Sequence, residues 1–101
     1  MQVSIVSADG RSVIRLLGRF DFNSHREFRE AVDQALGSEG SNEVAVDLGS
    51  VEYLDSSALG MLLMLRDKAH NAGKTVSLAN CRGAVRQVLD IANFGKLFSI
   101  D

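Results

Sequence analysis

Two adjacent serines, Ser56 and Ser57, follow the carboxylate of Asp55 and precede the strongly apolar segment Leu59 to Leu65. The run before them, Glu43 to Leu48, is short and mostly apolar, as expected for a central parallel strand. Two hydroxyls therefore lie where a loop becomes a helix. Such a position suits an N-cap, because a serine oxygen accepts a hydrogen bond from a free backbone N–H. It also suits a phosphate, because a helix N-terminus favours negative charge.

Spacing alone leaves both roles of the serine pair open, because one serine can cap the helix while the other stays exposed. A phosphate would add nearly two negative charges at this point. The helix dipole would tolerate that charge, whereas Asp55 would oppose it by repulsion between like charges. We therefore expect phosphorylation to change the surface that a partner reads and to leave the fold intact.

The N-terminal part of the chain predicts a β-hairpin. Val3, Ile5 and Ser7 fit a first strand, and Asp9–Gly10 is a typical hairpin turn. A second, antiparallel strand is expected over Val13 to Leu17. A further turn is expected over Gly49 to Leu54, between the apolar strand and the serines.

Three helices and one more strand follow from the spacing of apolar residues. The helices are expected over Ser24 to Leu36, Ser57 to Asn71 and Arg82 to Ala92, and the strand over Thr75 to Ala79. Ser24 with Glu27 has the spacing of a capping box, while Gly37 and Gly73 act as stop signals. Phe94, Leu97 and Phe98 form an apolar tail that should pack back onto the sheet. This order of elements predicts an α/β fold in which helices cover a mixed sheet.

The second helix carries apolar residues on more than one side. With Leu59 set at 0° and about 100° per residue, a core-facing stripe is predicted to contain Leu59, Leu62, Leu63, Ala69 and His70. Met61, Met64 and Leu65 are then predicted to face away from that core. Thioethers on a surface suit contact with a partner, but another helix or the C-terminal tail could equally cover them.

Length, charge and cysteine content exclude several classes of protein. A chain of 101 residues is a single domain, and its net charge of −2 with scattered Lys and Arg argues against nucleic-acid binding. The lone Cys81 excludes an internal disulfide and fits a reducing, cytoplasmic compartment. We see neither a signal peptide nor a membrane span.

The side chains that could perform catalysis or bind a metal do not form a known pattern. His25 and His70 share no metal-ligand spacing with Cys81. The sequence has no Gly-x-Ser-x-Gly elbow and no phosphate-binding glycine pattern. We therefore expect no metal, no cofactor and no catalytic residue.

The stretch from Val44 to Gly60, which includes Asp55-Ser56-Ser57-Ala-Leu-Gly, resembles the signature of the STAS domain family, the anti-sigma factor antagonists. The resemblance covers essentially the whole chain. It includes Gly18 to Asp21 before the first helix, as well as Val88-Leu89 and Phe94 to Phe98 near the end. Ala58 is a mild departure, because many members have glycine there.

The resemblance implies a mixed sheet of four or five strands with helices mainly on one face, and no catalysis. It implies that Ser56, rather than Ser57, is phosphorylated by a partner serine kinase. From the residues themselves, we expect Ser57 or its backbone to start the helix. In such partner switching the unphosphorylated form captures an anti-sigma factor, often the kinase itself, and so frees a sigma factor for transcription. A protein phosphatase, which can be fused to a response regulator, restores the active form.

On this interpretation the partner-binding residues are Asp21, Asp55, Ser56, Ser57, Met61, Met64 and Leu65. Asp21 is expected near Ser56 because the loop before the first helix is adjacent in this family's fold. We expect a monomer when free. The alternative is a constitutive adaptor, such as the cytoplasmic subunit of a lipid-transport ATPase, in which the serine pair is only a cap. A small enzyme would require turnover that is lost on Ser56→Ala.

Overall fold

A two-residue turn joins the first two strands, β1 (Gln2–Ala8) and β2 (Arg11–Phe20). Asp9 and Gly10 both have positive φ angles, 51° and 79°, which a two-residue hairpin turn of the favoured type requires. The strands pair antiparallel from Gln2 to Leu17, so the predicted hairpin is confirmed. These features belong to a computed structural model that describes residues 1–38 and 40–101.

Three further strands run parallel to β2 and complete one sheet. They are β3 (Glu43–Leu54), β4 (Thr75–Ala79) and β5 (Ser99–Ile100), and the order across the sheet is β1-β2-β3-β4-β5. The predicted mixed sheet is therefore confirmed with five strands. The short β5 was not expected from the sequence.

The expected turn over residues 49–54 was wrong, because β3 continues to Leu54. Its pairing with β2 shifts register twice, between Arg15 and Leu17 and between Gly18 and Arg19, and each time β3 contains the extra residue. Such bulges bend a strand without ending it. The glycine that suggested a turn, Gly49, lies at the first shift.

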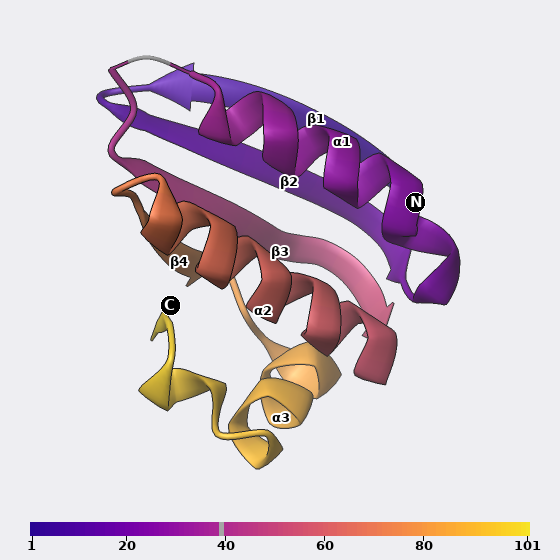
Figure 1. Ribbon diagram of the computed structural model, residues 1–101. Helices are drawn as coiled ribbons and strands as arrows, with labels where there is room; N and C mark the ends of the chain where they lie inside the picture. The colour runs from indigo at the N-terminus through magenta and orange to yellow at the C-terminus, as the bar shows by residue number, and fades with distance from the viewer. Residues whose placement is uncertain (39) are drawn as a thin grey trace.

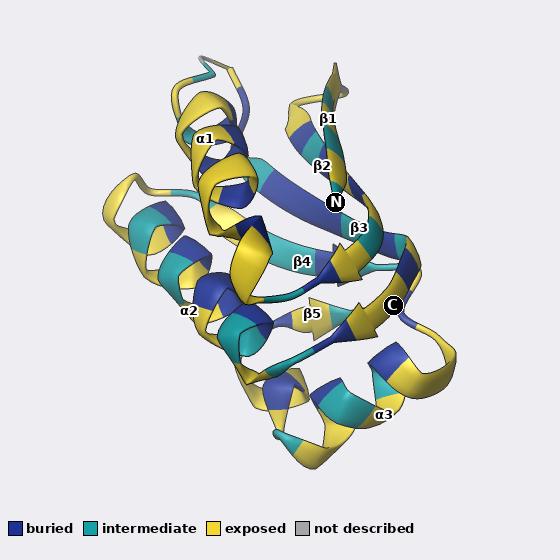
Figure 2. Ribbon diagram, turned by 90° about the vertical axis from the view of Figure 1, so that its right-hand side faces the viewer, coloured by how far each residue is buried: buried dark blue, intermediate teal, exposed yellow. Residues whose placement is uncertain are grey.

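Two long helices cover one face of the sheet side by side (Figures 1 and 2). The first, α1 (His25–Leu36), packs on β1 and β2, and α2 (Ser56–Asn71) packs on β3 and β4. The shorter α3 (Gly83–Ile91) lies apart from this pair and contacts β3. Within the described ranges, none of the helices has the length and apolarity that crossing a bilayer requires.

The predicted orientation of α2 was right for Leu62 and Ala69, which are buried, and wrong for Met61, Leu63, Leu65 and His70. Its buried residues are Ala58, Met61, Leu62, Leu65 and Ala69. Met61 and Leu65, expected at the surface, are 2% and 0% exposed, whereas Leu63, expected in the core, is 37% exposed. His70 is also exposed, and Met64 is half-buried. Because α2 is apolar on nearly every side, its sequence defines no preferred direction, and the sheet and α1 determine which side is buried.

The C-terminal segment packs back onto the domain through its two phenylalanines. Phe94, which starts the single turn η2 (Phe94–Lys96), and Phe98 are buried, and their rings stack with centroids 5.3 Å apart. Leu97 is 40% exposed, so the predicted packing of the tail holds for Phe94 and Phe98 only. The Asp101 N–H then donates to the Leu78 carbonyl at 2.9 Å and fixes the end of the chain.

Candidate functional site

The ends of β2 and β3 meet at one edge of the sheet. Phe20 pairs with Leu54 in the parallel register, and the Asp55 N–H donates to the Phe20 carbonyl at 3.4 Å. The next residue after Phe20 is Asp21, which therefore lies beside Asp55. The expected proximity of Asp21 to the serine pair is confirmed by this register.

Asp55 is the N-cap of α2. Its backbone is extended, with φ −112°, and its Oδ1 accepts a hydrogen bond from the Ala58 N–H at 2.9 Å. The expectation that Ser57 starts the helix was wrong, because α2 begins at Ser56. A carboxylate is a strong N-cap and also favours the positive end of the helix dipole. Both serines therefore lie in the first turn of a helix that neither of them has to cap.

The two serines differ in exposure. Ser56 is exposed, whereas Ser57 is half-buried beside the fully buried Ala58. A kinase or a binding partner can therefore reach the Ser56 hydroxyl more readily. This difference could not be read from the sequence, because it depends on which side of α2 faces the sheet.

Asp21 caps the single turn η1 (Phe22–Ser24) that leads into α1. Its Oδ1 accepts from the Asn23 N–H at 3.0 Å, and the Ser24 Oγ accepts from the Asp21 N–H at 3.2 Å. The Ser24 hydroxyl also donates to the Arg19 carbonyl at 3.1 Å. The capping box expected from Ser24 and Glu27 was therefore wrong, because Ser24 completes a box with Asp21 instead.

Three exposed side chains at this edge were not singled out from the sequence. Arg19 pairs with Asp21 (Nε to Oδ2, 3.6 Å), and its guanidinium lies 4.1 Å from the centroid of the Tyr53 ring. Phe22 is 68% exposed. Aromatic and arginine side chains are enriched where proteins bind one another. The sequence signal that could have identified Phe22 is its position directly after Asp21.

A polar network supports the bulge through which β3 reaches the site. Asp47 Oδ1 accepts from the Gly49 N–H at 2.9 Å and from Asn80 Nδ2 at 3.0 Å, and Arg15 pairs with Oδ2 at 3.6 Å. Burial raises the pKa of Asp47, but the hydrogen bonds from Asn80 and Gly49 and the charge of Arg15 outweigh it and lower the pKa overall. Arg82 donates to the Gly49 carbonyl at 2.9 Å and ties α3 to the same bulge.

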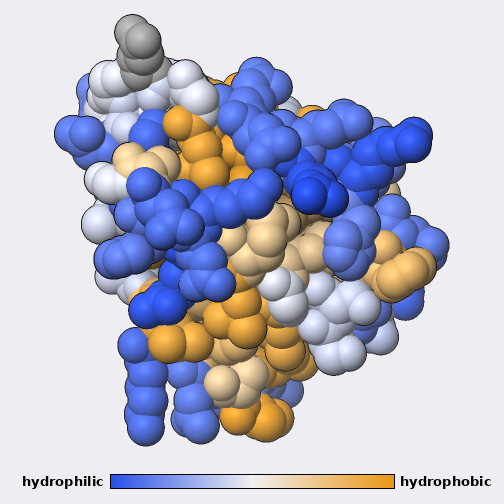
Figure 3. Space-filling model, in the orientation of Figure 1, coloured by the Kyte–Doolittle hydropathy of each residue, from blue (hydrophilic) through white to orange (hydrophobic). Residues whose placement is uncertain are grey.

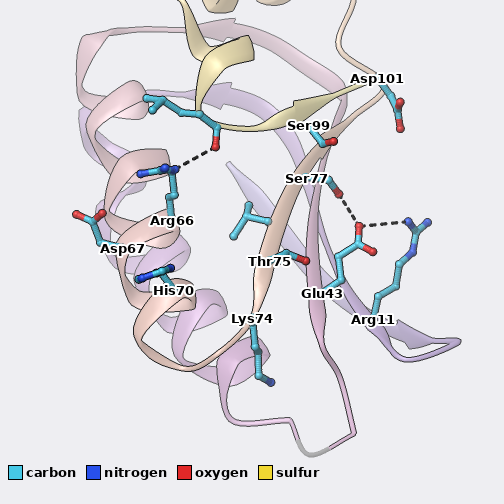
Figure 4. Close-up of a pocket in the computed structure, with 12 residues that line it drawn as sticks. Arg11, Glu43, Arg66, Asp67, His70, Lys74, Thr75, Ser77, Ser99 and Asp101 are labelled. Atoms are coloured by element: carbon cyan, nitrogen blue, oxygen red, sulfur yellow. Dashed lines mark hydrogen bonds and ion pairs between the residues drawn. The ribbon is translucent and has the colours of Figure 1, made fainter.

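A cavity of about 660 Å³ lies at the other end of the domain (Figure 4). It opens where β3 and β4 begin and α2 ends, and His70 in its lining lies roughly 20 Å along α2 from Ser56 at about 1.5 Å per residue. In its lining, Ser77 donates to Glu43 at 2.8 Å, and Arg11 lies 3.9 Å from the same carboxylate. This mixed, polar hollow does not coincide with the predicted site.

Cys81 and the two histidines form no site with one another in the described part of the chain, where no group of three metal-ligating side chains occurs. Cys81 is buried, and burial raises the pKa of its thiol to about 11. A buried, protonated thiol is a poor nucleophile and a poor metal ligand.

The geometry joins a capped helix N-terminus with an exposed serine to a second capped loop, and a family model described as "Mlab, STAS domain" matches residues 3–99. The chain belongs to the STAS domain family. A STAS-domain containing protein of Pseudomonas aeruginosa (strain UCBPP-PA14) is 47% identical over 98 residues, which are 96% of this chain and 95% of that protein.

Two more distant proteins bear on the interpretation of this STAS domain. An anti-sigma F factor antagonist of Paenibacillus polymyxa is 22% identical over 100 residues, which cover 99% of this chain and 86% of that protein. The structure of the Bacillus cell fate determinant SpoIIAA in its phosphorylated form superposes with a TM-score of 0.73 at 18% identity, covering 99% of this chain and 91% of that one. The latter likeness establishes the shared fold.

Proposed function

We propose that this STAS domain is an anti-anti-sigma factor, a phosphorylation-switched binding protein that captures an anti-sigma factor while Ser56 is unmodified. Release of a sigma factor would then change transcription in the cytoplasm. A relative named for antagonism of a sigma factor's inhibitor supports this role. The residues that contact the partner would be Asp21, Asp55, Ser56 and Ser57. Of the three apolar contacts expected from the sequence, Met64 alone is partly exposed and could join them.

The observation that carries the proposal is that Asp55, and not Ser56, caps α2. Asp55 supplies the cap of α2, so the exposed Ser56 hydroxyl has no structural duty at the helix start. A phosphate on Ser56 would meet free backbone N–H groups and the positive end of the dipole. It would also place two charges beside the Asp55 carboxylate, on a surface that a partner reads.

The mechanism is a change in complementarity at the edge where β2 and β3 end. The ends of these strands also carry the exposed side chains of Phe22, Tyr53 and Arg19, while Ser56 itself is neutral. A phosphate would repel any acidic group that the partner presents there, and it would lose hydration against any apolar group. Like charges brought together across an interface cost several kcal/mol, which is enough to reverse binding. A phosphatase would restore the neutral surface.

Phosphorylation mapping tests the proposal. Each serine kinase of the anti-sigma class encoded in the same genome is purified and incubated with the domain and ATP, and the product is mapped by mass spectrometry. One phosphate is expected, on Ser56, lost in Ser56→Ala and retained in Ser57→Ala. No incorporation by any of these kinases, together with a stable complex with an ATPase, would favour the constitutive adaptor instead.

A further inference from the structure

Gly60 lies in the interior of α2, where a glycine is not needed by the fold. A Cβ added there would have no neighbouring atom within 4 Å, and its φ angle is not in the left-handed range. The residue is exposed. Because glycine destabilises a helix interior relative to alanine, the domain bears a cost for which nothing inside the domain gives a reason.

Gly60 lies on one surface stripe with Ser56 and Leu63. At 100° per residue, positions seven apart differ by only about 20°, so Ser56 and Leu63 point the same way, with Gly60 between them. The separation along the axis is about 10 Å. All three residues are outside the core, and Leu63 is 37% exposed. A partner that contacts Ser56 over a normal footprint of about 800 Å² must also cover this stripe.

Apolar surface continues from Leu63 onto the C-terminal segment. Arg66, one turn beyond Leu63, donates from Nε to the Leu97 carbonyl at 3.0 Å, which brings this side of α2 against the tail. Leu97 is 40% exposed, and Ile91, at the end of α3, is 84% exposed. Figure 3 shows hydrophobic side chains gathered below α2, toward α3 and the C-terminal segment.

We propose that a helix of the partner protein crosses α2 at Gly60 and packs its apolar side chains on Leu63 and Leu97. This inference rests on the proposed function, because the same partner reads Ser56. A glycine lets two backbones approach closely, and the separation of packed helices depends on the side chains between them. The partner helix would come closest to α2 at Gly60, where no side chain intervenes, and its apolar side chains would pack on Leu63 and Leu97.

The test separates binding from folding. Gly60→Ala should raise the Tm by roughly 2–8 °C, because alanine favours the helix. It should also weaken binding to the purified anti-sigma kinase by about tenfold or more, because its methyl group occupies the crossing point. A glycine kept for the fold alone would move both quantities in the same direction.

Leu63→Asp provides the second arm and Leu17→Asp its matched control. Leu17 is 41% exposed on β2, an exposure close to that of Leu63. The affinity of the kinase for Leu17→Asp should equal its affinity for the wild type, whereas binding to Leu63→Asp should be lost. Unchanged affinity of Gly60→Ala and Leu63→Asp, with Ser56→Asp still defective, would overturn the crossing helix and leave the switch standing. A dimer of the free domain that Gly60→Ala disrupts would overturn it too, since the stripe would then bind a second copy.

Discussion

The Asp55 N–H donates to the Phe20 carbonyl, 3.4 Å away, and so joins the ends of two parallel strands. This bond sets the two capping carboxylates, Asp21 and Asp55, side by side at one edge of the sheet. Each holds the start of a helical turn through its own Oδ1. The exposed Ser56 therefore follows directly after a capped and hydrogen-bonded strand end.

The cap of α2 should depend on Asp55 and on neither serine. Asp55→Ala is expected to lower the free energy of unfolding by about 1 kcal/mol, because the Ala58 N–H loses its acceptor. That corresponds to roughly 4–8 °C in Tm for a domain of this size. Asp55→Asn should lose little, and so should Ser57→Ala, in thermal unfolding followed by circular dichroism. A Ser57→Ala variant as unstable as Asp55→Ala would contradict the assignment.

The burial of Met61 can be tested against its half-buried neighbour Met64. Met61→Ala should cost about 2–5 kcal/mol of unfolding free energy, because it leaves a cavity under α2. Met64→Ala should cost clearly less. Urea unfolding at equal protein concentration measures both values. Equal and small losses would mean that α2 is turned the other way, as its sequence pattern suggested.

Asp47 makes stability depend on acid pH. Its lowered pKa means that the folded state holds a carboxylate, so its contribution is present above the ordinary value of 3.8 and lost as pH falls toward the folded-state pKa. Asp47→Asn should cost about 1–3 kcal/mol near neutral pH, because the Gly49 N–H and Arg15 lose a charged partner. The difference from the wild type should shrink as the pH falls from about 5 to below the ordinary value of 3.8. A gap that stays constant over this range would show that the charge contributes nothing.

Cys81 should resist alkylation in the native state. A pKa raised to about 11 from 9.0 leaves roughly a hundredfold less thiolate at pH 8 than an ordinary cysteine has. Iodoacetamide labelling followed by mass spectrometry should be slow for the folded domain and fast in urea. Rapid labelling without denaturant would show that the thiol is accessible and ionised.

The features that the sequence predicted well are local. Asp9–Gly10 dictates its own turn, and the regular spacing of Phe28, Ala31, Val32 and Ala35 specifies which side of α1 is buried. In both cases the residues that decide the structure are within a few positions of one another. The order of elements predicted the mixed sheet, and the resemblance to the STAS family added the number of strands and the proximity of Asp21 to the serine loop.

The features that were missed depend on contacts distant in sequence. The orientation of α2 is decided by the sheet and α1, because Met61 and Leu63 are equally suited to a core. The two-residue strand β5 depends on its pairing with the distant β4, where the Asp101 N–H donates to the Leu78 carbonyl. Gly49 is a residue type typical of turns. Hydrogen bonds with Asp47 and Arg82 nevertheless hold it in a bulge within a continuing strand.

The affinity of the domain for a purified anti-sigma serine kinase from the same genome, measured by calorimetry, tests the central claim most directly. Ser56→Ala should bind as tightly as the unmodified wild type, because the hydroxyl has no structural duty. Ser56→Asp should bind at least about tenfold more weakly, because it places a negative charge on a surface whose partner is complementary to a neutral serine. Both variants should unfold at nearly the wild-type temperature. Equal affinities for Ser56→Ala and Ser56→Asp would contradict the switch.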